Sequence, residues 1–582
     1  MRILFEREVY SRETLENLGL SSYAFFDRDN REGIIPYVGY IYSLKAKDSI
    51  FILPKVFLFE GTGDKKKNEF AFGKYHRDEV LEISSKHNPL KKDGLDKILF
   101  GLSTWIYQAI DKYSKRHKKN DIVKRSTIQG VNSHNGNSDQ SLIDTILSLL
   151  RFHKDHANLF TYISIINSSG NNKIHWTKTI SKVQPIIQNG CPYYVDFKNK
   201  NKTINFDEEL IILFYSVLQY LKQEYFFPVK ANINYDLISA SKIDSMIEHG
   251  RGTRTLLKIR RKYFKDELVQ LWKLLFTFFS QAETIRSGKC TEEALLATSF
   301  DRIFEDMVDC LVGDEEYANL KSNDDGKEID HIYAEESFFE GKLIYYIGDS
   351  KYYSHGNDIE LKSIAKQFTY ARNIIQVNID IFNKEEKNLT KSEEKIFNKM
   401  RYRDPLTEGY NFSPNFFIRG YINAEDMKDG RANYGEERLV HNKQIMPVNT
   451  HFFNRPFDRD TLILKAYNIN FLFVLASYIT NSNDKQTKER IQKKFRTDIQ
   501  EVYNNKFDFF RVRPKGYDII TQDLLKTFVD KYFRQFHGNM YHAEGKDFIW
   551  FAFDRGSMTE KQLYEKLDNS VVITKCKLGR SN

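Results

Sequence analysis

Hydrophobic and polar residues recur along the first part of the chain with two spacings, one typical of strands and one typical of amphipathic helices. Residues 35–60 hold two apolar runs, rich in Ile, Val, Tyr and Phe, on either side of the polar segment KAKDS, which predicts a β-hairpin. Apolar residues at helical spacing predict helices within residues 95–113, 141–160 and 207–226. We therefore expect this part of the chain to combine β-rich and helical units.

Polar stretches divide the 582 residues, a length that suggests several domains. Residues 126–140 (STIQGVNSHNGNSDQ) have little to bury and are predicted to be a linker. The predicted domains are an N-terminal β-rich and helical domain, an α/β domain for partner docking or DNA contact, a central domain, and a C-terminal α-rich extension. Their predicted ranges are 1–125, 141–284, 285–425 and 426–582.

In the central range, helices and strands alternate around acidic residues. Residues 291–314 have the apolar spacing of an amphipathic helix, with Thr291 as the N-cap and Gly313 as the stop. The segments KEIDHIYAEES and LIYYIGDSKYY are predicted strands. DIELKSIAKQFTYARNIIQV then has helical spacing, and residues 415–422 predict another strand. The predicted order is helix, strand, strand, helix, strand.

Three residues of this block are suited to metal-dependent phosphodiester hydrolysis: Asp330, Asp349 and Lys351. Positions 349 and 351 of a strand point to the same face, so a carboxylate and an ammonium would project side by side. Hydrolysis needs a divalent cation, which acidic side chains can hold, and positive charge near the phosphate. Glu305 borders the apolar stripe of the preceding helix. A bare D…DxK pattern is common, and its position at the end of an apolar strand between two helices makes it more specific.

Each of these residues also has a purely structural interpretation. Asp349 and Lys351 could form an exposed charge pair, since surface ion pairs are plentiful and weak. Glu305 could simply solvate a helix face. His331 follows Asp330 directly and, on a strand, faces away from it, so we assign it no chemistry.

The central motif also resembles a known fold. Glu305, Asp330, the tripeptide Asp349-Ser-Lys351 and the KQFTY helix are similar to the PD-(D/E)xK nuclease fold. The wider chain resembles the LlaJI-like restriction proteins, relatives of the McrC nuclease subunit, through YVGYI, FILPKVFLF, KIHWTKTI, GCPYYVD and LILKAYNINFLFVLASYI. The resemblance implies an α+β multidomain protein with a central PD-(D/E)xK domain. It further implies that Asp330 and Asp349 bind Mg²⁺ or Mn²⁺, that Lys351 assists the attacking water and that Glu305 supports the metal shell.

The resemblance extends to two residues of the second helix, Gln367 and Tyr370, which it places beside the site as substrate contacts. Residues three apart lie on one face of a helix. The spacing Gln367-x-x-Tyr370 is one residue shorter than the QxxxY pattern of many related nucleases. In addition, Ile329 occupies the position of the proline in the PD-(D/E)xK motif. Packing in the core is an equally good interpretation of Gln367 and Tyr370.

A basic segment supplies further candidates for contact with DNA. Residues 251–265 contain seven Lys and Arg in fifteen positions, and Arg254, Arg260 and Arg261 are predicted to contact the phosphate backbone. The start of a solvated helix explains the same pattern equally well.

The sequence contains no GxxxxGK[ST] loop, so this chain is not expected to power DNA translocation by itself. The resemblance implies that a separate McrB-like AAA+ GTPase is the motor and that the N-terminal half is its docking region. The expected function is the nuclease subunit of a DNA restriction system for phage defence, acting on double-stranded DNA. The alternative is a non-catalytic DNA-binding or scaffold subunit that regulates the motor.

Two features bear on the compartment. The apolar stretches are too short to cross a bilayer, and the four cysteines are scattered without metal-ligand spacing. This usage is typical of a reducing compartment, so we expect a cytoplasmic protein that does not bind membranes. The cysteines are Cys191, Cys290, Cys310 and Cys576.

Overall fold

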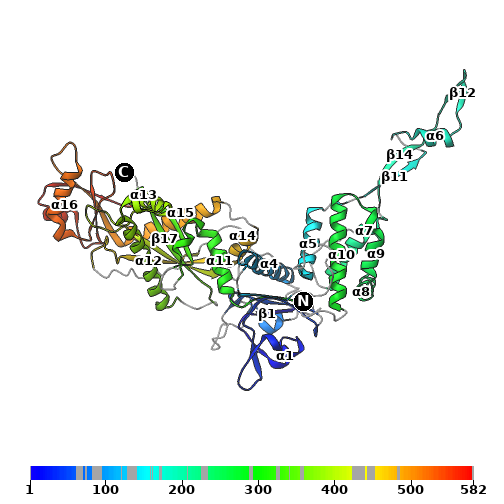
Figure 1. The fold of residues 1–582 in the computed structure, drawn as a ribbon, viewed down its shortest axis with the longest axis horizontal. Helices are drawn as coiled ribbons and strands as arrows, with labels where there is room; N and C mark the ends of the chain where they lie inside the picture. Colours follow the sequence, from blue (N-terminus) through cyan, green and yellow to red (C-terminus); the bar gives the residue numbers. More distant parts are fainter. Residues whose placement is uncertain are drawn as a thin grey trace.

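The computed structural model describes most of the chain. The described residues are 2–46, 48–59, 70–71, 75–81, 95–118, 121–126, 141–156, 159, 161–168, 173–205, 207–224, 234–286, 293–322, 328–339, 341–353, 359–422, 440–441, 453–480 and 485–579. The molecule is elongated, with several separate sheets and groups of helices (Figure 1). This confirms a mixed multidomain protein of helices and sheets. Most of the predicted linker, together with Thr291 and Cys290, lies outside the described residues.

The N-terminal unit is built on a five-stranded sheet with the order β1-β6-β5-β15-β10. The predicted hairpin is confirmed, since β5 (Val38–Ser43) and β6 (Asp48–Leu53) pair antiparallel. β1 (Arg2–Phe5) pairs with β6 in parallel. β15 (Glu293–Ala297) lies between β5 and β10 (Val123–Ser126), so this sheet includes a strand from far along the chain.

Residues 291–314 do not form a single helix, and this prediction is wrong at its start. Every residue of β15 is buried, and helix α11 (Phe300–Val312) begins only after Ser299. A short, fully buried apolar run has no periodicity that separates a strand from a helix. The predicted stop is confirmed, because Gly313 is the C-cap of α11.

Helix α4 (Leu95–Arg116), which confirms a predicted helix, packs against β5 and β15 and also against α14 (Phe471–Thr480). Two small sheets and two short helices complete the N-terminal unit. They are β2 (Val9–Ser11), α1 (Arg12–Asn17), β3 (Phe25–Phe26), β4 (Glu32–Ile34), β7 (Leu58–Phe59), β8 (Phe70–Ala71), β9 (Tyr75–His76) and α2 (Arg77–Val80).

A lobe of helices lies beside the N-terminal unit (Figure 1). Two of these helices fall in predicted segments, and the others come from the basic block and its surroundings. The helices are α5 (Leu142–Asp155), α7 (Glu209–Glu224), α8 (Ala240–Glu248), α9 (Arg251–Ile259), the 3-10 turn η3 (Arg260–Lys262) and α10 (Asp266–Arg286).

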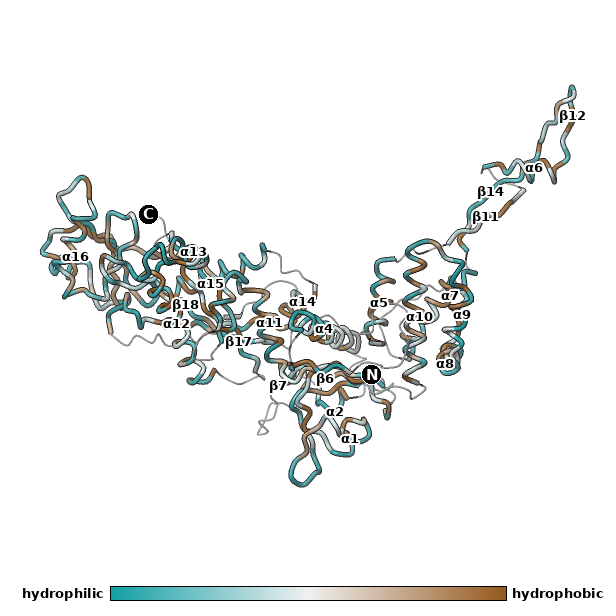
Figure 2. The backbone as a smooth tube through the Cα atoms, in the orientation of Figure 1, coloured by the Kyte–Doolittle hydropathy of each residue, from teal (hydrophilic) through white to brown (hydrophobic). Residues whose placement is uncertain are grey.

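An arm, defined here as residues 161–205, projects from this lobe away from the rest of the molecule (Figure 1). It consists of two antiparallel strand pairs with a short helix between them. Apolar segments run along it (Figure 2). Its elements are β11 (Tyr162–Asn167), α6 (Trp176–Lys182), β12 (Ile186–Gln188), β13 (Cys191–Tyr193) and β14 (Asn199–Ile204).

The central unit is a mixed five-stranded sheet with the order β16-β17-β18-β20-β19. β16 (His331–Glu336) and β17 (Leu343–Lys351) form an antiparallel pair, and β18 (Ser413–Tyr421) follows β17 in parallel. β20 (Leu462–Asn470) continues the sheet in parallel, so the sheet extends past the boundary predicted at residue 425. The remaining elements are α12 (Leu361–Phe382), α13 (Lys391–Lys399) and β19 (Val440–His441).

The sequence predicted an α-rich C-terminal region, but this region also contains a sheet. A four-stranded sheet with the order β22-β23-β21-β24 follows the long helix α15 (Lys485–Lys506). β21 alternates apolar and polar residues only over a short stretch, and every residue of β23 is buried, so neither pattern is as clear as the periodicity of the helices between them. The elements are β21 (Phe507–Pro514), α16 (Gln522–Phe536), β22 (Met540–Tyr541), β23 (Ile549–Asp554), α17 (Glu560–Lys566) and β24 (Val571–Cys576).

Candidate active site

The hairpin of β16 and β17 brings the two predicted metal ligands together. His331 pairs with Gly348 in the antiparallel register, so the preceding residue, Asp330, lies next to Asp349. The backbone N–H of Ser350 donates to Asp330 Oδ2 over 2.8 Å and fixes the carboxylate at this end of the hairpin. Asp330 is half-buried. Asp330 and Asp349, which are distant in the sequence, thus meet because β16 and β17 pair.

Asp349 and Lys351 form an ion pair at the carboxyl end of β17. The side chains are only 4% and 14% exposed, so the alternative of an exposed surface pair is wrong. The Lys351 ammonium also lies 5.4 Å from the centroid of the Phe417 ring on β18. A charge pair that is removed from water interacts more strongly than one on the surface.

Glu305 reaches the same site from α11. Burial, followed by the negative charge of Asp330, raises the pKa of Glu305 to about 8, although Arg302 opposes the shift. Burial and the charge of Asp330 also raise the pKa of Asp349 to about 6, although Lys351 opposes the shift. Three acidic side chains therefore influence one another in a partly buried place, which a solvated helix face would not produce.

These carboxylates suit a hard divalent cation that keeps several of its water ligands. Their mutual repulsion raises two pKa values, and a bound cation would relieve that repulsion. Among the residues that the structure describes, no three His, Cys, Asp or Glu side chains form a ready-made metal cage. Carboxylate oxygens are the donors that Mg²⁺ and Mn²⁺ prefer, so these residues fit either ion.

Gln367 and Tyr370 lie in the interior beneath the site. Gln367 Nε2 donates to the backbone oxygen of Ile347 over 2.9 Å, and Tyr370 is fully buried. Both positions favour the packing interpretation, and substrate contact by either residue stays a prediction.

Sequence patterns do not single out Lys366, which lies on the same helix. Its ammonium lies 5.3 Å from the centroid of the Tyr370 ring. Burial lowers the pKa of Lys366, but Tyr370, Asp349 and Asp330 together raise it above its ordinary value. One feature of the sequence could have indicated Lys366: it directly precedes Gln367, on the helix that follows the DxK strand.

The predicted DNA-contacting arginines do not join the acidic site. Arg254, Arg260 and Arg261 are exposed on α9 and η3, which lie in the helical lobe well away from β17 (Figure 1). Arg254 Nη2 donates to the backbone oxygen of His249 over 2.9 Å, and the Arg260 guanidinium stacks 5.3 Å from the Trp272 ring. Any contact of these residues with DNA would be at a second place on the molecule.

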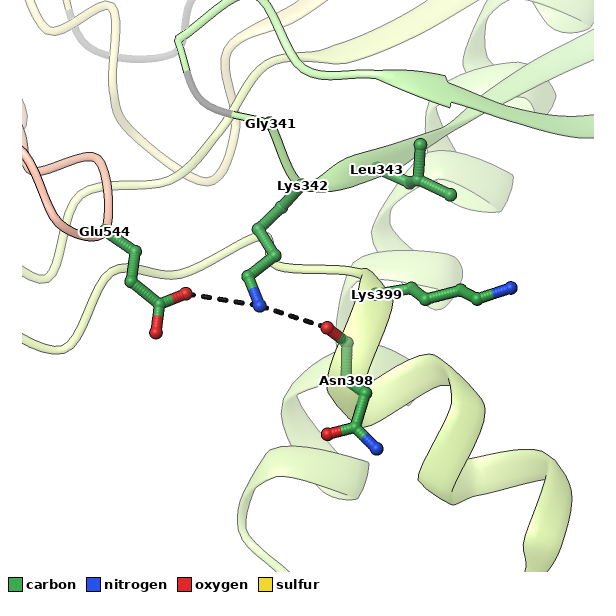
Figure 3. A pocket seen from close by; sticks show the side chains of 6 residues that line it. All are labelled: Gly341, Lys342, Leu343, Asn398, Lys399 and Glu544. Atoms are coloured by element: carbon green, nitrogen blue, oxygen red, sulfur yellow. Dashed lines mark hydrogen bonds and ion pairs between the residues drawn. The ribbon is translucent and has the colours of Figure 1, made fainter.

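A surface pocket at the opposite end of β17 does not coincide with the acidic site (Figure 3). Lys342 Nζ donates there to the backbone oxygen of Asn398 over 3.0 Å and lies 3.2 Å from a carboxylate oxygen of Glu544. The pocket contains none of the predicted site residues.

The sequence profile of the LlaJI restriction endonuclease family matches residues 37–399, which is more than half of the chain. The chain therefore belongs to the LlaJI restriction endonuclease family. The matched range contains the β16–β17 hairpin, α11 and most of the elements around the acidic site.

One solved structure matches this chain over most of its length. It is a refined half-complex from a tetradecameric assembly of Thermococcus gammatolerans McrB AAA+ hexamers with bound McrC. The match covers 83% of this chain and 99% of that chain, with 10% identity and a TM-score of 0.27, which does not establish a shared fold. No curated protein matches the chain. Among the helices in the described ranges, none has the length and apolar character that a membrane span needs.

Proposed function

We propose that this chain is the nuclease subunit of a DNA restriction system and cleaves double-stranded DNA at a PD-(D/E)xK site. The observation that carries the proposal is the meeting of Asp330, Asp349 and Lys351 at the end of one hairpin, in a member of a restriction endonuclease family. The arrangement of the sheet also supports it, since an antiparallel hairpin leads into parallel strands, with α11 before the hairpin and α12 after it. Such a subunit would act on DNA in the cytoplasm.

Each residue has a distinct part in the proposed reaction. Asp330 and Asp349 would hold Mg²⁺ or Mn²⁺, which when bound supplies Lewis-acid chemistry and makes water more acidic. Lys351 places a positive charge beside Asp349, where it can offset negative charge that builds on the phosphate oxygens. Glu305 adds a carboxyl with a raised pKa at the edge of the site, where it would support the metal shell.

The proposal is tested by a DNA cleavage assay in Mg²⁺ or Mn²⁺, with EDTA as the metal-free control. The purified chain is compared with Asp349→Asn, which keeps the shape of the side chain and removes its charge. We expect cleavage by the wild type in the presence of metal and almost none by the variant. Equal cleavage by both proteins would contradict the proposed site. Absence of cleavage by the wild type, with and without its motor, would favour the scaffold alternative.

We also propose that a McrB-like AAA+ GTPase docks on the N-terminal half of the chain through the arm. The arm exposes several large apolar side chains. Such apolar surface usually marks a binding site for another protein. The exposed residues are Tyr162, Ile165, Trp176, Ile180, Ile186, Ile187, Tyr193 and Val195.

This docking is best tested in the full chain. A fragment ending at residue 250 would lack β15, which lies in the middle of the N-terminal sheet. Asn167 pairs with Asn199, so residues 168–198 can be replaced by a short Gly-rich turn of about two residues without disturbing the rest of β11 and β14.

We expect the shortened chain to keep its thermal stability and basal DNA cleavage and to lose binding to a McrB-like GTPase. We also expect the isolated wild-type chain to cleave poorly until the motor is added. Retained binding by the shortened chain would refute the role of the arm.

A further inference from the structure

We infer that Lys321, Asp309 and His331 form a positioning network for Asp330, an inference that rests on the proposed nuclease function. The network starts from Lys321, whose Nζ donates to the backbone oxygen of Asp330 over 2.8 Å and lies 2.6 Å from Asp309 Oδ1. One ammonium therefore ties the main chain of a proposed metal ligand to a second carboxylate.

The network continues through the imidazole of His331. His331 Nδ1 lies 3.3 Å from Asp309 Oδ1, and His331 Nε2 lies 2.6 Å from Ser350 Oγ. Since a carboxylate only accepts, Nδ1–H donates to Asp309, and Nε2 is left to pair with the hydroxyl of Ser350. His331 is completely buried.

The hydrogen-bond network returns to Asp330 through Ser350, the middle residue of the DxK motif. The backbone N–H of Ser350 donates to Asp330 Oδ2 over 2.8 Å, so Asp330 is held at its main-chain oxygen and at its carboxylate by two ends of one network. Asp330 precedes β16 and has no place in the strand ladder of the hairpin. Its position therefore depends on Lys321 and on the backbone N–H of Ser350 as well as on the pairing of β16 and β17.

A network of this kind matters because ligand geometry sets both cation affinity and reaction rate. Partners behind metal-binding residues typically change affinity or activity by about 10- to 100-fold when they are removed. Lys321, Asp309 and His331 are not among the proposed metal ligands, and their bonds lead to Asp330 and Ser350, so they act through Asp330 as positioning residues.

Lys321 allows a well-controlled test, because Lys342 forms the same kinds of bond elsewhere. Lys342 Nζ also binds one backbone oxygen and one carboxylate, at the start of β17 and away from Asp330 (Figure 3). The side chains of Lys321 and Lys342 are 21% and 32% exposed. Lys342→Met therefore controls for the general loss of a partly buried lysine, and Lys321→Arg restores the lost charge and donors.

The experiment compares the full-length wild type with Lys321→Met, Lys321→Arg, Lys342→Met and Asp330→Asn. Mn²⁺ affinity is measured by isothermal titration calorimetry, kcat and KM by cleavage of duplex DNA, and stability by thermal unfolding. We expect Lys321→Met to weaken Mn²⁺ binding and to lower kcat by about 10-fold or more, with KM changed by less than about threefold. Lys321→Arg should recover much of the loss, and Lys342→Met should behave as the wild type.

Two results would overturn the inference, and they differ in what they say of the proposed function. If Asp330→Asn loses Mn²⁺ binding and cleavage while Lys321→Met matches Lys342→Met, the network has no positioning role and the nuclease site stands. If Asp330→Asn keeps wild-type Mn²⁺ binding and cleavage, Asp330 is not a ligand, and both the proposed site and the network fall.

Discussion

Two lysines of the central sheet have similar surroundings, and only one of them belongs to the proposed site. The side chains of Lys351 and Lys465 are 14% and 13% exposed, and each pairs with a carboxylate, Asp349 or Asp498. Each ammonium also lies over an aromatic ring, at 5.4 Å and 5.2 Å from the centroids. Burial and pairing therefore do not distinguish a catalytic lysine. What distinguishes Lys351 is that its partner, Asp349, lies next to Asp330 at the end of the β16–β17 hairpin.

This pair gives the first prediction. Lys351→Ala should lower DNA cleavage by about 100-fold or more, because a charge that stabilises the transition state is lost. Folding and DNA affinity should change little beyond the effect seen in Lys465→Ala, the matched control. Cleavage rates, DNA binding and thermal unfolding of both variants check this expectation. Wild-type cleavage by Lys351→Ala would show that another lysine, such as Lys366, has the proposed role.

A second prediction at the residue scale concerns Glu293 in the N-terminal sheet. Burial raises the pKa of Glu293 to about 7, although the backbone N–H of Leu142 and the hydroxyl of Ser141 oppose the shift, and Asp144 adds to it. The folded state therefore holds a proton that the unfolded chain releases near its ordinary pKa. Stability contributed by this group is complete at low pH and is lost as the pH rises from about 4.5 to about 7.

Glu293→Gln should remove that pH dependence. The difference of pKa corresponds to about 3 kcal/mol at most, so the variant should be more stable than the wild type at pH 8 by up to this amount. At pH 4.5 the two proteins should unfold at similar temperatures. Thermal unfolding of both proteins across this range provides the measurement, and a constant difference at all pH values would count against the assignment.

At the scale of elements, the long helix α15 holds the end of α11, the helix that carries Glu305. Gln492 Nε2 donates to the backbone oxygen of Val312 over 2.9 Å, and Lys488 binds the backbone oxygen of Gly313. The last carbonyls of a helix have no partner within it, so side chains from another element can satisfy them. A segment far along the sequence thereby fixes one wall of the acidic site.

We predict that Gln492→Leu destabilises the protein by about 1–3 kcal/mol, because the buried oxygen of Val312 loses its donor. The loss should appear as a lower midpoint of chemical unfolding. Gln500→Leu provides a comparison on the same helix, since Gln500 is also a donor, to Leu578 rather than to α11. If only the Gln492 variant also loses DNA cleavage, α15 supports the site through α11; equal effects on cleavage would contradict that support.

At the scale of the whole molecule, the N-terminal unit contacts the acidic site directly. Tyr352, the residue after Lys351, donates from its hydroxyl to Glu6 Oε2 over 2.5 Å, next to the end of β1. The backbone N–H of Lys55, which follows β6, donates to the Tyr352 hydroxyl over 3.1 Å. The Tyr352 ring also lies against Phe300 and Phe304 of α11. A partner on the N-terminal half could therefore influence the site through one side chain.

We predict that Tyr352→Phe uncouples the two units. The ring should keep its packing, while Glu6 loses a buried hydrogen-bond donor, so basal cleavage should change by less than about threefold. Stimulation of cleavage by the proposed GTPase should fall by a larger factor. Tyr402→Phe is a suitable control, because its buried hydroxyl contacts Tyr345 within the central unit. Equal stimulation of wild type and Tyr352→Phe would exclude this route of communication.

Local patterns predicted much of the fold but failed where the burial of a segment hides its periodicity. The hairpin of β5 and β6 follows from two apolar runs on either side of a polar turn, and the helices α4, α5 and α7 follow from the helical spacing of their apolar residues. Every residue of the run EALLA of β15 is buried, and its pattern wrongly predicts the start of a helix. The strands of the C-terminal sheet were likewise obscured by the stronger pattern of the helices around them.

The sequence by itself determined which residues could do chemistry here: two acidic residues and a lysine, spaced so that strand pairing could bring them together. It also determined the apolar strand that ends in Asp349-Ser-Lys351. Only the tertiary structure decided that Lys321, Asp309 and His331 surround Asp330, that β20 completes the sheet, and that Tyr352 reaches the N-terminal unit. The physical reason is that periodicity records which side of an element is buried, whereas a contact between distant segments depends on how their surfaces pack, and no local pattern records that.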